Sequence, residues 1–74
     1  MDRAALEAAL AYAENQVATC DQNIARQRKV IADLELGAAD QKSERLVLAR
    51  LVTERRDRIE RRDILRLELN ARWT

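Results

Sequence analysis

Residues 34 to 43 read LELGAADQKS and contain Gly37, the only glycine of this 74-residue chain. Long runs of helix-forming residues lie on both sides, so this stretch decides whether the chain forms one helix or two. Gly37 suits the left-handed residue that ends many helices, and Asp40 can accept hydrogen bonds from the first amides of a following helix. We therefore predict one domain made of a helix, a turn and a second helix, over residues 3–36, 37–39 and 40–70.

The composition favours helices over strands. The chain has no proline, no phenylalanine, one tryptophan and one tyrosine, and 36% of its residues are charged. Strands need alternating β-branched and aromatic residues bounded by turn residues, which this sequence lacks. The profile is typical of coiled coils, and a chain this short buries too little surface to be comfortably stable without help.

An apolar heptad pattern runs through the first predicted helix. Steps of four and three residues from Leu6 to Leu34 select apolar residues at every position except Gln27, and we call this row the seam. Gln27 either sets the register of the helix pairing or lies at the edge of the seam. The same count continued past Gly37 meets Arg45, Arg55, Arg62 and Arg66. In a parallel dimer each arginine would face its own copy, so the pattern favours antiparallel packing.

Folding the seam back on itself pairs Val17 with Ile59 and Ile24 with Val52. Arg55 then faces the small Cys20, and Arg62 faces Ala13, so that arginine stems can cover short side chains while their charged ends reach water. The residues predicted to form this core are Leu6, Leu10, Val17, Cys20, Ile24, Ile31, Leu48, Val52, Ile59 and Leu69.

Two architectures satisfy this pairing. One is a hairpin within a single chain, about 50 Å long; the other is a swapped dimer of straight helices, about 100 Å long. A glycine followed closely by a capping residue favours the hairpin. We predict an all-α, coiled-coil-like antiparallel two-helix hairpin that dimerises into a four-helix bundle.

A second apolar stripe lies outside the predicted seam. Alanine recurs at every seventh residue, and apolar residues on the second helix also lie off the seam; this predicted second interface comprises Ala4, Ala11, Ala18, Ala25, Ala32, Leu51 and Leu65. Small side chains at fixed spacing allow another helix to approach closely. The alternative interpretation is that alanine is simply the best helix former.

Residues 54 to 66, ERRDRIERRDILR, form the most basic segment. Their acids precede arginines at helical spacing, as Glu54 precedes Arg58, which is typical of a solvated face with ion pairs. The alternative function is a nucleic-acid-associated regulator that uses Arg55, Arg58, Arg61 and Arg62. The chain has no histidine and one cysteine, so we expect no catalytic site, metal, cofactor or small-molecule substrate.

The expected role is therefore that of a non-catalytic interaction or assembly module. Its partner is expected to be a second copy of the chain or an unknown protein, and neither nucleic acid nor a membrane is favoured. A single cysteine and the lack of a signal peptide or membrane span predict a cytoplasmic protein.

The segment QVATCDQNIARQRKVIADLE, residues 16 to 35, resembles a run found in short, uncharacterised helical proteins of alphaproteobacteria. RDRI at residues 56–59 and the later LEL match them more loosely. A glycine turn often follows the LE in those proteins, so the resemblance implies a hairpin and a bacterial origin. The histidines common in their second helices are missing here, and the resemblance implies no activity.

Overall fold

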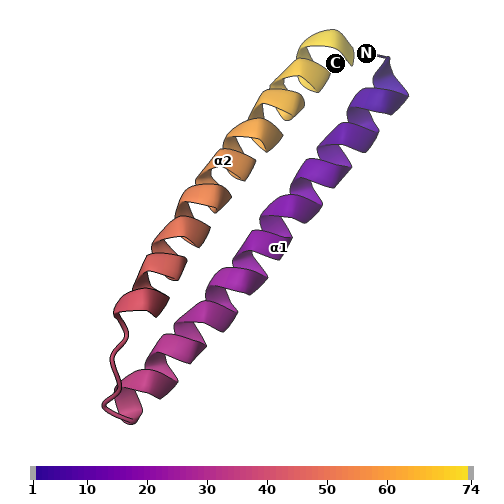
Figure 1. Cartoon of the computed structure of the whole chain (residues 1–74). Helices are drawn as coiled ribbons and strands as arrows, with labels where there is room; N and C mark the ends of the chain where they lie inside the picture. Colours follow the sequence, from indigo (N-terminus) through magenta and orange to yellow (C-terminus); the bar gives the residue numbers. More distant parts are fainter. Residues whose placement is uncertain (1, 74) are drawn as a thin grey trace.

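The computed structural model describes residues 2–73 and consists of two helices, α1 (Arg3–Leu36) and α2 (Lys42–Trp73). The helices lie side by side and run in opposite directions, so the start of α1 and the end of α2 lie at the same end of the molecule (Figure 1). The molecule measures 54 × 15 × 14 Å. This is the length expected of a hairpin, and the all-α antiparallel hairpin is confirmed.

Side-chain oxygens satisfy amides at the start of each helix. Asp2 accepts a hydrogen bond from the backbone N–H of Ala5 at 2.7 Å, and Asp40 accepts one from Lys42 at 3.0 Å. α1 has the predicted bounds, whereas α2 begins two residues later and ends three residues later than predicted. Asp40 therefore contacts the first amide of α2, as predicted, but the connection extends over residues 37–41.

The left-handed residue of the turn is Ala38, with φ 56°, and not Gly37, whose φ is −84°. The prediction for Gly37 was wrong by one position. The amides of Ala38 and Ala39 donate to the carbonyls of Glu35 and Leu34 at 3.1 and 3.0 Å. This pair of bonds is the Schellman motif, which requires the left-handed conformation one residue after the helix cap, and the cap here is Gly37.

Ala38→Gly is expected to stabilise the hairpin by about 1 kcal/mol, because glycine avoids the steric cost of a left-handed Cβ. Gly37→Ala is expected to stabilise it by about 0.5 kcal/mol, since alanine loses less chain entropy on folding. An added Cβ at residue 37 would meet its nearest atoms at 3.7 Å, an ordinary contact. Urea unfolding followed by circular dichroism, at one protein concentration, measures both effects. A lower urea midpoint for Ala38→Gly would contradict the assignment.

Candidate interaction site

The seam between the helices buries an apolar row that belongs mainly to α1. Seven apolar residues are buried in the part of the chain that the structure describes, and six of them lie on α1: Leu6, Ala13, Val17, Cys20, Ile24 and Ile31. α2 contributes one buried residue, Leu65, which packs against Leu6 and Ala13. Most of the apolar core therefore comes from one helix.

The remaining predicted core residues contribute less to the seam. Leu10 and Leu69 are half-buried and pack against the cluster formed by Leu6, Ala13 and Leu65. Leu48 and Ile59 are also half-buried. All four lie on the faces that the helices turn toward each other, at the edge of the covered region.

The face that α2 turns toward α1 is rotated relative to the predicted one. Val52, predicted in the core, is 45% exposed, whereas Leu65, predicted in the second interface, is 6% exposed. Leu51, also predicted in the second interface, is half-buried. The prediction carried the heptad phase of α1 through the turn, but residues 37–41 are not helical and the phase restarts. The rotation places leucines inward and leaves Arg66 in water. This arrangement is favourable because leucine is usually buried and arginine is usually exposed.

Arginine side chains cover the middle of the seam on the α2 side. Arg55, Arg58 and Arg62 are each half-buried. The side chain of Arg62 is only 25% exposed. Its ionic partner Asp63, 3.0 Å away, is a neighbour on the same helix, so this ion pair does not draw Arg62 toward α1. Packing of the arginine stem in the seam accounts for that burial, since an apolar stem can be covered while its charged end stays hydrated.

Three ion pairs cross between the helices. Arg66 lies 3.4 Å from Glu14, Arg45 lies 2.6 Å from Glu35, and Arg55 bonds to Asp21 between them. As the α1 partner advances along the chain, the α2 partner moves backward, which is the order of an antiparallel pair. The side chains are 41–58% exposed, so these pairs orient the helices more than they stabilise them.

Gln27 is the polar residue of the α1 seam, and it has a partner on α2. Its side-chain amide donates to the backbone carbonyl of Glu44 at 3.0 Å and to the Glu44 carboxylate at 2.6 Å. A half-buried amide with specific acceptors disfavours a slipped register, in which these bonds would be lost. The structure therefore supports the interpretation of Gln27 as a residue that sets the register.

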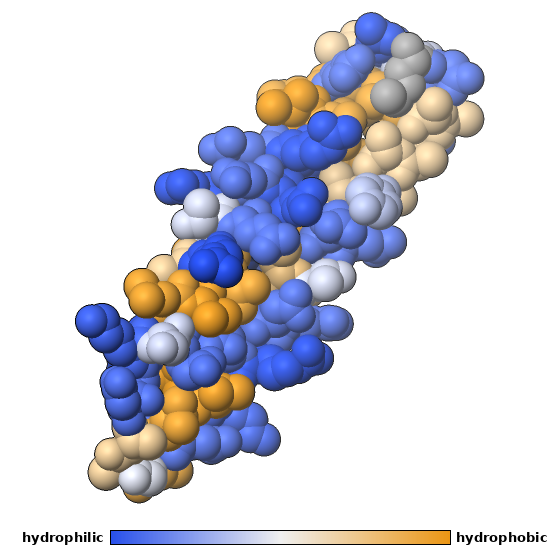
Figure 2. All heavy atoms as spheres, viewed as in Figure 1, coloured by the Kyte–Doolittle hydropathy of each residue, from blue (hydrophilic) through white to orange (hydrophobic). Residues whose placement is uncertain are grey.

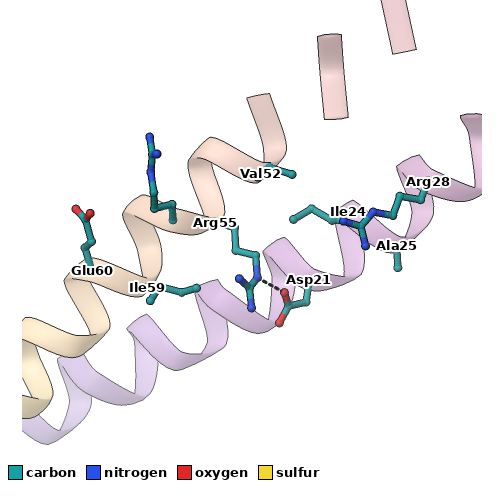
Figure 3. Close-up of a pocket in the computed structure, with 9 residues that line it drawn as sticks. Asp21, Ile24, Ala25, Arg28, Val52, Arg55, Ile59 and Glu60 are labelled. Carbon is teal, nitrogen blue, oxygen red and sulfur yellow. Dashed lines mark hydrogen bonds and ion pairs between the residues drawn. The ribbon is translucent and has the colours of Figure 1, made fainter. Parts of the chain in front are cut away.

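A hollow of about 530 Å³ opens at the middle of the hairpin (Figure 3). The side chains of Ile24 and Val52 point toward each other across it, and the Arg55–Asp21 pair borders it. Apolar and charged residues together form its lining: Asp21, Ile24, Ala25, Arg28, Val52, Arg55, Arg56, Ile59 and Glu60. Ile24, the member of the α1 row that lines the hollow, is still only 6% exposed, so the hollow lies beside the covered row.

The alanine row of the predicted second interface lies outside the seam, and its member Ala25 also borders the hollow. Ala4, Ala11, Ala18, Ala25 and Ala32 are all exposed. Figure 2 shows weakly hydrophobic, pale orange side chains along one edge of the molecule, over the N-terminal part of α1. The row is therefore available to a partner, and its two predicted companions on α2, Leu51 and Leu65, belong to the intramolecular seam instead.

Large apolar side chains are also exposed on α2. Leu46, Ile64 and Leu67 are each more than 60% exposed. In Figure 2 strongly hydrophobic groups on this helix are interrupted by hydrophilic ones. The apolar surface of α2 is therefore divided into separate spots.

The four arginines proposed for a nucleic-acid contact do not form one free basic face. Arg55 and Arg62 are half-buried in the seam, and Arg58 lies 3.7 Å from Glu54 on its own helix. Arg61 alone of the four is classed as exposed. Proteins that bind phosphate backbones present several basic side chains together on an accessible face, and this arrangement does not favour that function.

No helix in the described part of the chain has the length and apolar character needed to cross a membrane. Within residues 2–73, no group of three or more potential metal-ligating side chains lies close enough together to hold a metal ion. Comparison with known proteins gives no match to a protein-family model, a curated protein or a solved structure. The resemblance of residues 16 to 35 to short alphaproteobacterial proteins stays a prediction.

Leu65→Ala is expected to destabilise the hairpin by about 3 kcal/mol, because it opens a cavity against Leu6 and Ala13. Val52→Ala is the matched control and is expected to cost less than about 1 kcal/mol, since Val52 is nearly half exposed. Thermal unfolding followed by circular dichroism compares the two. A larger loss for Val52→Ala than for Leu65→Ala would show that the face predicted from the heptad pattern is the one that packs against α1.

Duplex DNA is expected to show no binding to the chain at low ionic strength, because three of the four candidate arginines are half-buried in the seam. Fluorescence anisotropy of labelled DNA measures this, with the titration repeated at higher salt. Binding that weakens steeply as salt rises would contradict the expectation and would support the nucleic-acid alternative.

Proposed function

We propose that this protein is a non-catalytic interaction module that acts by helical self-association, with two hairpins joining into a four-helix assembly. The observation that carries the proposal is the surface that one hairpin leaves uncovered. A compact monomer of 8.5 kDa exposes about 4,650 Å². This chain exposes 5494 Å².

The excess of about 840 Å² is close to the roughly 800 Å² that each partner buries in a standard protein–protein interface. Two helices packed along a single seam leave most of each helix in water, and in α2 only Leu65 is buried. Small cores of this kind usually need additional burial to be stable. Association of two hairpins supplies that burial without any other component.

The site geometry supports assembly more than chemistry. The hollow between the helices is bordered by the Arg55–Asp21 ion pair and by further charged side chains, and the exposed apolar side chains lie on outward helix surfaces. Outward apolar surface on a thin rod suits contact with another protein.

Sedimentation equilibrium of the full chain at micromolar concentrations is expected to give twice the 8.5 kDa chain mass. Helicity and thermal midpoint are expected to rise together with protein concentration, because folding and association are linked in an obligate dimer. A monomer mass over the whole concentration range, with an unchanged midpoint, would contradict the proposal.

A further inference from the structure

The charged residues of α1 are confined to one row over most of its length. Between residues 4 and 25 they are Glu7, Glu14 and Asp21, which recur at every seventh position. Glu14 and Asp21 bind Arg66 and Arg55 of α2, and Glu7 binds Arg3 at 2.9 Å. Every charge in this stretch is therefore paired within the hairpin, on the side of the helix next to α2.

The opposite side of α1 carries no charge in the same stretch. Steps of four and three residues select Ala4, Ala8, Ala11, Asn15, Ala18, Gln22 and Ala25, all of them exposed. We call these seven residues the uncharged face. Its spacing is that of a second coiled-coil seam, and its small side chains allow helix axes to come close together.

α2 differs sharply from this pattern. Charged residues make up half of its sequence and occur on all of its sides. Its exposed apolar residues form separate groups: Leu46 and Val47 lie about 27 Å along the helix from Ile64 and Leu67. The cores of protein interfaces are depleted in charge, so the uncharged face of α1 is the better candidate for a continuous interface.

We propose, on the basis of the self-association above, that the uncharged face binds the same face of a second copy, with the two α1 helices antiparallel. Contact through one face on both copies is the isologous geometry of a two-fold dimer. The four helices then form a layer in which both α1 helices are central and both charged α2 helices are outermost. This differs from a bundle in which all four helices share one core.

Charge favours the antiparallel direction. The start of α1 carries two acids, Asp2 and Glu7, and one base, Arg3, whereas three bases, Arg26, Arg28 and Lys29, follow the uncharged face. Antiparallel copies keep the two basic segments at opposite ends of the interface. Parallel copies would place the basic segments against each other, which is unfavourable.

The fit in area is also consistent with a second copy. The uncharged face runs about 32 Å along the helix. The row on one side of it adds the uncharged Ala5, Tyr12 and Thr19, with Tyr12 63% exposed, and the acidic row borders its other side. The excess surface of the monomer, about 840 Å², matches one side of a standard dimer.

Ala18→Glu tests the face by placing a charge at its centre. Sedimentation of the full chain is expected to show a dimer for the wild type and a dissociation constant at least tenfold higher for Ala18→Glu. Ala49→Glu is the matched control, because Ala49 is an exposed alanine on α2, and it is expected to dimerise like the wild type. Leu67→Glu tests the competing apolar spot on α2 and is also expected to leave the dimer intact.

The outcomes separate the two proposals. A wild-type dimer that tolerates Ala18→Glu but is broken by Leu67→Glu would overturn the uncharged face and leave self-association standing. A wild-type chain that stays monomeric would overturn both. Circular dichroism of Ala18→Glu at high concentration shows whether the variant is still helical, and Asn15→Lys provides a second charge on the same face.

Cysteine cross-linking tests the direction. Asn15 lies near the midpoint of the uncharged face, so Asn15→Cys is expected to oxidise to a disulfide-linked dimer. Ala4→Cys is expected to cross-link poorly with itself and well when mixed with Ala25→Cys. The unchanged chain is the control, since Cys20 is buried. Efficient self-cross-linking of Ala4→Cys would show parallel copies and would overturn the antiparallel assignment.

Discussion

The stability of the hairpin depends on one apolar row of α1 that α2 must cover. Several of the residues that α2 turns toward this row are arginines rather than apolar residues. The row supplies six of the seven buried side chains in the described chain. On the α2 side, Leu65 and half-buried leucines and arginines pack against it. An arginine can cover an apolar neighbour only with its stem, because its guanidinium must stay in contact with water or an acid. The charged ends consequently lie at the rim of the seam.

The acidic residues of α1 follow from this constraint. Glu14, Asp21 and Glu35 lie on the side of α1 next to α2, and each pairs with an arginine of α2, of which Arg55 is also half-buried in the seam. The ion pairs are exposed and individually weak, but together with the hydrogen bonds from Gln27 to Glu44 they suit one antiparallel register. The apolar row supplies the attraction between the helices, and the polar contacts select how they align.

The same division leaves α1 with a face that has no charge. Acids are needed only on the row next to α2, and the other exposed positions between residues 4 and 25 are alanines or uncharged polar residues. A thin hairpin with a small core benefits from further burial, and an uncharged face of small residues can be buried without dehydrating ions. The composition of the seam and the proposed self-association therefore have a common physical origin.

The turn shows how backbone hydrogen bonds, rather than glycine itself, reverse the chain. The Schellman bonds from Ala38 and Ala39 to Glu35 and Leu34 require a left-handed residue at position 38, and alanine adopts it at a steric cost. Gly37 is the cap residue that precedes it, and its φ of −84° suits any residue. Packing of α1 against α2 maintains this strained alanine.

The amino-acid sequence by itself determined the first helix, the position of the reversal and the antiparallel order, because the heptad row from Leu6 to Ile31 is continuous and seam arginines exclude a parallel pair. Only the tertiary structure decided which side of α2 faces inward. Leu51 and Val52 are adjacent, as are Leu65 and Arg66, so two neighbouring faces of α2 satisfy the heptad spacing. The choice between them depends on the non-helical residues 37–41, which break the helical phase, and on the burial of leucine in preference to arginine.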